Sequence, residues 1–234
     1  MKQLITSCFI LLLTTMGLMA QNTQYQEMMS KNIANINYNA SMEQLQDAAN
    51  QMERVATVEK SEWLPSYYSS LAYVYMATKE LQKGGGEIMS YVDKAQASLN
   101  KAKEIAPDNS EVLTAQGYIY MAHIWPNPMA NGAKYTPMAF AQLDKAIKAD
   151  PTNPRPHYLK GQNLFYTPAA FGGGKKNAAK QFKMAEDKFA AFKPASDISP
   201  NWGEESNAYF FNQCKPVEKS INTKMQDQLS TGEN

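Results

Sequence analysis

One pattern of small and large apolar residues occurs twice in this chain, and the second copy begins 44 residues after the first. The copies are Ala95, Leu99, Ala102, Pro107 and Gly117, and then Ala139, Leu143, Ala146, Pro151 and Gly161. Alanine and leucine at spacings of three and four residues lie on one side of a helix, where a neighbouring helix can pack closely. The proline ends that helix, and the glycine allows tight packing in the next one. The pattern therefore predicts an all-α protein of repeated helix pairs.

The residues around the second copy match a known repeat. A first helix carries Leu113, Gln116, Gly117 and Tyr120, and a second helix and its end carry Ala139, Leu143, Ala146 and Pro151. This arrangement resembles the tetratricopeptide repeat (TPR), a helix-turn-helix unit of about 34 residues. About ten more residues separate Tyr120 from Ala139 than the family spacing allows, so we expect an insertion between the two helices. The resemblance implies a right-handed superhelical array of antiparallel helix pairs, a TPR-like α-solenoid, with helical caps at both ends.

The N-terminal segment, residues 1–20, is typical of a secretory signal peptide. Lys2 precedes a largely apolar run from Leu4 to Met19, which ends at the small residue Ala20. The run is short and is interrupted by threonine, so an uncleaved membrane anchor is the weaker alternative. We therefore expect a bacterial protein that is exported, either periplasmic or secreted, with no stable membrane insertion after signal cleavage.

The rest of the chain divides at its prolines and by the repeat pattern. Residues 21–62 are expected to form a helical pair, either a cap or a degenerate repeat, with Ser41 capping its second helix. Three TPR-like units are expected in residues 63–193, with bounds of 63–107, 110–151 and 154–193. Residues 194–234 are expected to form a C-terminal capping helix and a polar tail.

Composition and motifs give no support for nucleic-acid binding or catalysis. Loss of Lys2 with the signal leaves 22 of the 23 basic residues against 22 acidic ones, a balance that does not favour nucleic acid. The two histidines, His123 and His157, lack metal-ligand spacing. The run from Gly172 to Lys175 lacks the second half of a phosphate-binding loop. We therefore expect no catalytic residues, no metal and no cofactor, and a protein that is not an enzyme.

The first candidate binding surface is the concave groove that the first helices of the units would line. Tyrosine, methionine and arginine provide contact area and polar anchors in interfaces, so this groove fits a protein or peptide partner in the cell envelope. The alternative is that these residues pack the array against its own ends. The groove residues are Tyr73, Met76, Tyr118, Met121, Arg155, Tyr158, Gln162, Phe165 and Tyr166.

The second candidate surface is the edge where the three insertions would gather, because connections within stacked helix pairs leave on the same side. Trp125, Tyr135 and Phe171 are expected there, on segments rich in glycine and proline. They would either contact a ligand or fold back under their own loops.

Two functional hypotheses follow from these surfaces. The leading one is a non-catalytic protein-interaction scaffold of the bacterial cell envelope. The alternative is a module that binds a small molecule or glycan through aromatic residues on the inserted loops. A co-purifying envelope protein favours the scaffold, whereas saturable sugar binding that is lost in Trp125→Ala favours the binding module.

Overall fold

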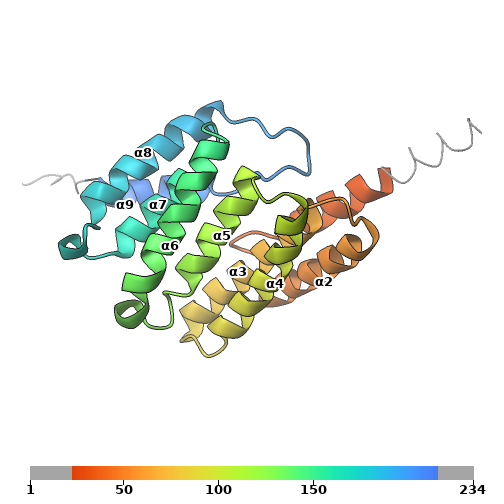
Figure 1. Cartoon of the computed structure of the whole chain (residues 1–234), viewed down its shortest axis with the longest axis horizontal. Helices are drawn as coiled ribbons and strands as arrows, with labels where there is room; N and C mark the ends of the chain where they lie inside the picture. The colour runs from red at the N-terminus through yellow and green to blue at the C-terminus, as the bar shows by residue number, and fades with distance from the viewer. Residues whose placement is uncertain (1–22, 216–234) are drawn as a thin grey trace, which may run out of the picture.

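The computed structural model describes residues 23–215, so the expected signal peptide and most of the polar tail lie outside the described residues. Within this range all regular structure is helical, which confirms the predicted all-α class. The helices are residues 23–33, α2 (Met42–Val58), α3 (Leu64–Lys83), α4 (Ile88–Ile105), α5 (Ser110–Ala122), α6 (Pro128–Ala149), α7 (Arg155–Tyr166), the short 3-10 helix η1 (Ala169–Phe171), α8 (Lys175–Ala191) and α9 (Glu204–Cys214) (Figure 1). None of the helices between residues 23 and 215 is both long and apolar enough to cross a bilayer.

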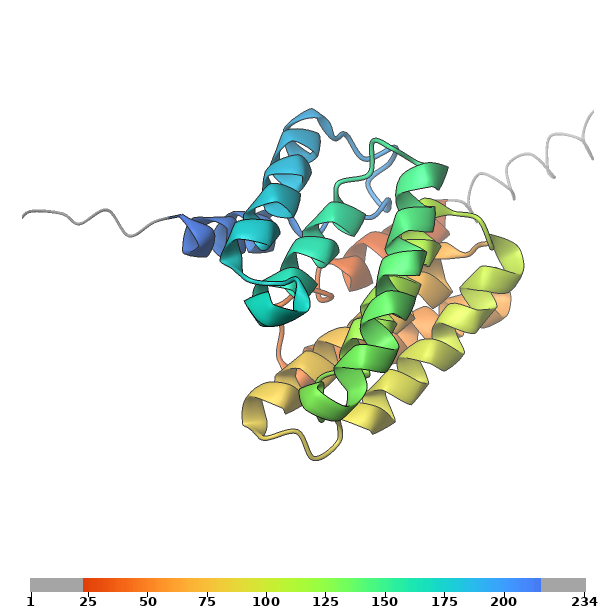
Figure 2. The ribbon, with the colours of Figure 1, turned by 60° about the vertical axis from the view of Figure 1, so that its left-hand side comes forward.

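The helices follow one another through space in chain order, and Figure 2 shows the same order from a second direction. From α2 to α9, each helix contacts the next one in the sequence. In addition, α3 contacts α5, α5 contacts α7, and α7 contacts α9. The odd-numbered helices therefore form a continuous inner row, and α4, α6 and α8 pack beside it as an outer row.

The two rows differ in sequence as their surroundings require. Every residue of α3 from Pro65 to Ala77 is buried, and most of α5 is buried too. A helix that is enclosed on all sides needs no polar face, whereas a helix at the surface buries one stripe. The outer helices bury such stripes, which are Ala95, Leu99 and Ala102 in α4, Ala139, Leu143 and Ala146 in α6, and Ala178, Phe182 and Ala185 in α8.

Gly117 and Gly161 lie where two neighbouring helices come closest. A Cβ atom on Gly117 would lie 2.7 Å from Cδ2 of Leu143, and one on Gly161 would lie 2.6 Å from Cδ1 of Phe182. These distances are far below van der Waals contact, so a larger residue cannot enter without displacing its neighbour. The predicted role of both glycines in close helix packing is confirmed.

Local signals fix the ends of several helices. Ser41 Oγ accepts a hydrogen bond from the Gln44 N–H at 3.1 Å, and Gln44 Oε1 accepts one from the Ser41 N–H at 2.8 Å. This reciprocal pair is a capping box, and it confirms the predicted cap at the start of α2. At the other end of the next helix, Gly84 has φ +112°, a left-handed conformation that suits glycine, and it ends α3.

The expected insertion in the second unit is not a loop, which corrects the sequence-based expectation. Asn127 Oδ1 accepts a hydrogen bond from the Ala130 N–H at 3.1 Å, and Pro128 occupies the first turn, where its missing N–H is not needed. A helix therefore begins at Pro128 and continues through Gly132 and Pro137. The extra residues lengthen the second helix of the unit and leave only a short connection before it.

Candidate functional site

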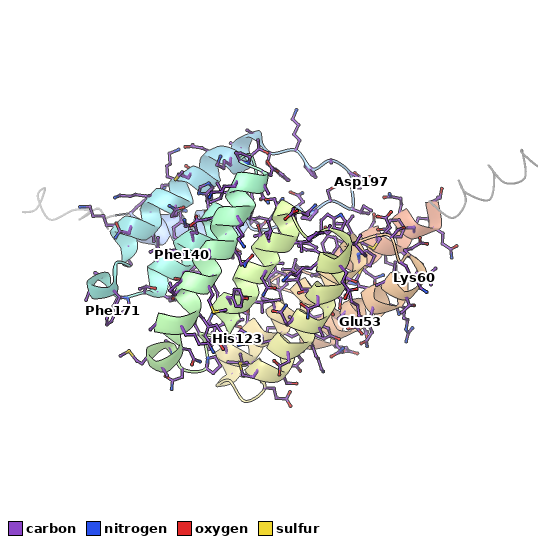
Figure 3. The ribbon with its side chains drawn as sticks, viewed as in Figure 1. Glu53, Lys60, His123, Phe140, Phe171 and Asp197 are labelled. Carbon is purple, nitrogen blue, oxygen red and sulfur yellow. The ribbon has the colours of Figure 1, made fainter. Side chains whose placement is uncertain are left out.

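Four residues of the expected groove are buried in the inner row. Tyr73 and Met76 of α3 and Tyr118 and Met121 of α5 are at most 4% exposed. The hydroxyl of Tyr73 donates a hydrogen bond to Oε1 of Glu53 on α2 at 3.0 Å, and Figure 3 labels Glu53. These side chains hold the chain's own helices together, because packing around α3 and α5 encloses them. The expectation that they face a partner is therefore corrected.

Arg155 is likewise buried, at 1% exposure, and is committed to an ion pair. Its Nε donates hydrogen bonds to both carboxylate oxygens of Glu111 at 2.9 Å, and its Nη2 lies 2.5 Å from Oε1. Asn153 also donates to the same carboxylate, from Nδ2 to Oε1 at 2.8 Å. Charge-assisted bonds of this kind fix α5 relative to α7. The guanidinium is consequently not available to anchor a partner.

The segment between α8 and α9, residues 192–203, lies across the inner row, and we call it the strap. Tyr68 of α3 donates its hydroxyl to the carbonyl of Ile198 at 2.9 Å. The ring of Trp202 stacks on Tyr118 of α5, with centroids 6.1 Å apart and planes inclined by 20°. The strap therefore occupies inner surface that the first helices were expected to offer to a partner.

Six tyrosines form a second feature of the inner row, which we call the tyrosine cluster. They come from the segment before α2 and from α3, α5, α7 and α9, and the pKa values of Tyr75, Tyr118, Tyr158 and Tyr166 are each raised by at least one other member. The members are Tyr38, Tyr75, Tyr118, Tyr158, Tyr166 and Tyr209. Tyr38, Tyr166 and Tyr209 are exposed by 51%, 70% and 61%, whereas the other three are buried. The cluster thus has a buried base and three exposed rings.

Burial favours the neutral form of the hydroxyls of Tyr75, Tyr118, Tyr158 and Tyr166. Burial raises the pKa of Tyr118, a hydrogen bond with Thr78 opposes this, and Tyr38 and Tyr166 raise the pKa further. Partial burial also raises the pKa of Tyr166, and its tyrosine neighbours add to the effect. A protonated phenol donates hydrogen bonds and keeps an apolar ring face. The exposed rings therefore offer flat apolar surface with a polar edge.

Tyr38 reaches the cluster from a loop, residues 34–40, which we call the arm. Asn37 Oδ1 accepts two backbone N–H groups within the arm, at 2.9 and 3.0 Å, which closes a tight turn. Two side chains of α3 then hold Tyr38 itself. Lys79 Nζ donates to its carbonyl oxygen at 3.1 Å, and Gln82 Nε2 donates to its hydroxyl. An exposed ring is thereby ordered by contacts with a distant helix.

The remaining groove residues lie beside the cluster on α7. Gln162 Nε2 donates a hydrogen bond to the hydroxyl of Tyr158 at 3.2 Å. Phe165 packs edge-on against Phe210 of α9, with ring centroids 5.3 Å apart. Of the expected groove residues, the structure brings three into the tyrosine cluster and places these two next to it, so the candidate site is centred on α5, α7 and the arm.

The three aromatics of the expected loop edge lie in different surroundings. Trp125 packs edge-on against Tyr118, with centroids 6.1 Å apart, and so joins the base of the tyrosine cluster. Tyr135 lies within α6 and stacks on His123 at 4.6 Å, which corrects its expected place on a loop. Phe171 is 73% exposed on η1, at the turn before α8 and apart from His123 (Figure 3). Contacts with neighbouring helices, and not the inserted loops, decide where the first two rings lie.

The two histidines, His123 and His157, lie in the described part of the chain and belong to no cluster of metal ligands there. Between residues 23 and 215 there is no group of three histidine, cysteine or acidic side chains that could hold a metal ion. Nδ1 of His157 lies 3.0 Å from Oε1 of Gln181, and burial lowers the pKa of this histidine. Burial also lowers the pKa of His123. Each histidine therefore takes part in a packing contact.

Sequence reasoning missed the arm, the strap and three members of the cluster, which are Tyr38, Tyr75 and Tyr209. The only local signal for Tyr38 was a single aromatic residue in an asparagine-rich break. Its partners lie on helices far along the chain, and such contacts leave no periodic pattern in the sequence.

A comparison with solved structures places this fold beside the HusA haemophore from Porphyromonas gingivalis. The two structures match with a TM-score of 0.73 and 28% sequence identity, over 85% of this chain and 96% of the HusA chain. No protein-family model matches the chain, and no curated protein matches it. The similarity supports the all-helical fold over nearly the whole of the HusA chain. It does not bear on the TPR resemblance, which stays a prediction.

Proposed function

We propose that this protein is a non-catalytic carrier of haem or a related porphyrin, exported to the bacterial periplasm or secreted. The single observation that carries the proposal is the similarity in fold and sequence to a haemophore over most of both chains. The tyrosine cluster adds a surface with suitable chemistry. A porphyrin is a flat aromatic ring, and flat aromatic ligands are held by aromatic side chains that stack on their faces.

The exposed rings of Tyr38, Tyr166 and Tyr209 would make these stacking contacts. They are exposed by 51%, 70% and 61%, so each has apolar area to cover when a ligand binds. Their phenols can donate hydrogen bonds to polar groups at the edge of the ligand. Tyrosine is also among the side chains that bind haem iron in proteins, so the chemistry of the cluster fits this ligand.

This proposal adopts the small-molecule alternative in place of the protein-interaction scaffold. The inner surface that a peptide would use is taken up by the strap, residues 192–203, and by buried side chains such as Arg155. In this proposal the tyrosine cluster, and not Trp125 or Phe171, stacks on the ligand. Trp125 packs edge-on against Tyr118, which is a buried member of the cluster. We further propose that α3 to α8 are three TPR-like pairs of antiparallel helices in a right-handed array.

The direct test is a titration of the purified protein with haem, followed by the Soret absorption band. We expect a saturable spectral change with one tight binding step. The double variant Tyr38→Ala/Tyr166→Ala should weaken binding about a hundredfold, because each stacked ring contributes about 1.4 kcal/mol. Tyr91→Ala is the matched control, since Tyr91 lies on α4 and hydrogen-bonds to Glu87 of the same segment.

Three results decide between the proposals. Binding that is lost in the double variant and kept in the control supports a carrier with its site at the tyrosine cluster. Absence of any saturable change with haem refutes the carrier. Equal binding by the double variant and the unchanged protein refutes the assigned site, and a panel of envelope sugars then tests the glycan alternative.

A further inference from the structure

Lys79 of α3 contacts the arm and forms no ion pair with any residue in the range 23–215. Lys79 of α3 donates from Nζ to the carbonyl of Tyr38 at 3.1 Å, so its ammonium sits at the foot of the arm. An ammonium has three N–H donors, and this contact uses one of them. Two donors and a full positive charge therefore remain at the backbone of Tyr38, whose side chain is exposed.

Neighbouring charges do not neutralise this lysine. Lys83, one turn further along α3, pairs with Glu80 at 3.5 Å. Within residues 23–215, no carboxylate lies at ion-pair distance from Lys79. The side chain is half-buried, which restricts the directions that its charge can face. A charge held in one place and left without a counter-ion favours an anionic group of the ligand.

We propose that Lys79 binds a carboxylate of the ligand, so that the site prefers planar aromatic molecules with an acidic group at one edge. The inference rests on the proposed function and refines it by naming the substrate class. The ring of the ligand covers Tyr38 and Tyr166, and its carboxylate accepts the free N–H donors of Lys79. Charge-assisted hydrogen bonds are the strong ones in such sites, and Arg or Lys is the usual donor.

The test compares protoporphyrin IX with its dimethyl ester, which has the same ring and no free carboxylate. Binding of each is followed by fluorescence for the unchanged protein, Lys79→Met, Lys79→Arg and the control Lys101→Met, in which an exposed lysine of α4 is removed. We expect Lys79→Met to weaken binding of the acid about tenfold more than binding of the ester, because both probes lose the contact that orders Tyr38 but only the acid loses a charged partner. Lys79→Arg should restore most of the affinity for the acid, and Lys101→Met should change neither.

The outcomes separate this inference from the proposed function. If Lys79→Met weakens both probes equally, the lysine only positions the arm through Tyr38, and the inference is refuted. If neither probe loses affinity in that variant, the inference is refuted as well, although the carrier function stands. If neither probe binds the unchanged protein, the proposed function fails and the inference fails with it.

Discussion

Replacement of Gly161 by alanine tests the close helix contact on which the fold depends. A Cβ at this position would lie 2.6 Å from Cδ1 and Cε1 of Phe182, and 3.1 Å from Cγ. Phe182 has no room to withdraw, because it is fully buried and stacks on Phe210 with centroids 5.9 Å apart. Overpacking of this kind costs about 1–3 kcal/mol. Alanine gains about 1 kcal/mol of helix propensity over glycine, so we expect a net loss of up to about 2 kcal/mol.

The same substitution at Gly132 provides the matched control. This glycine lies inside α6, and a Cβ added there would meet no atom within 4 Å. Gly132→Ala therefore gains helix propensity without a clash and should stabilise the protein by about 0.5–1 kcal/mol. The two substitutions thus change the free energy of unfolding in opposite directions, although both replace glycine by alanine within a helix.

Urea denaturation followed by circular dichroism measures both effects. The midpoint should fall for Gly161→Ala and rise for Gly132→Ala, with the slope of the transition unchanged, because neither change alters the surface exposed on unfolding. In a Phe182→Leu background, Gly161→Ala should cost less, since contacting residues show coupled effects. Equal shifts for the two alanines, or no coupling to Phe182, would refute the packing argument.

Three further predictions concern stability. Glu53→Leu should lower the free energy of unfolding by about 1–2 kcal/mol in urea, because it removes the carboxylate that accepts the hydroxyl of the buried Tyr73 at 3.0 Å; an unchanged midpoint would contradict this. Ser41→Ala removes the capping box of α2 and should cost about 1 kcal/mol in the same assay. Burial lowers the pKa of His157, so the unfolded chain binds its proton more readily. The free energy of unfolding should therefore fall as the pH drops below about 6.5, and His157→Gln should reduce that slope.

The parts of the fold that sequence analysis predicts are those set by local spacing. The stripes that contain Leu99 and Leu143, the close contacts of Gly117 and Gly161, and the cap at Ser41 each follow from residues within a few turns of one another. Spacing of this kind decides which face of a helix is apolar. It does not decide whether the opposite face is covered by another segment.

The errors arose where distant segments meet. A TPR-like register places Tyr118 on an open inner face, but Trp202 of the strap stacks on it from far along the chain. Pro137 lies in the stretch between Tyr120 and Ala139 where an insertion between two helices is expected, although a helix start capped by Asn127 carries α6 past it. In both cases tertiary contacts or a strong helix start outweighed the local signal, as they often do when propensity is weak.

The distribution of exposed aromatics fits the proposed binding role because, within residues 23–215, most of the other rings are buried or partly buried. The strap covers Tyr118, and helix contacts cover Tyr73 and Tyr75. Tyr38 is the informative exception, because two side chains of α3 order its arm while half of the residue stays exposed. Ordering a loop costs conformational entropy. An exposed ring makes few contacts in the folded chain that could offset this cost. A ligand that covers the ring gains from the ordering already done, which is how preorganised sites achieve affinity. We therefore propose that the arm takes part in binding and that Lys79 and Gln82 hold it in place.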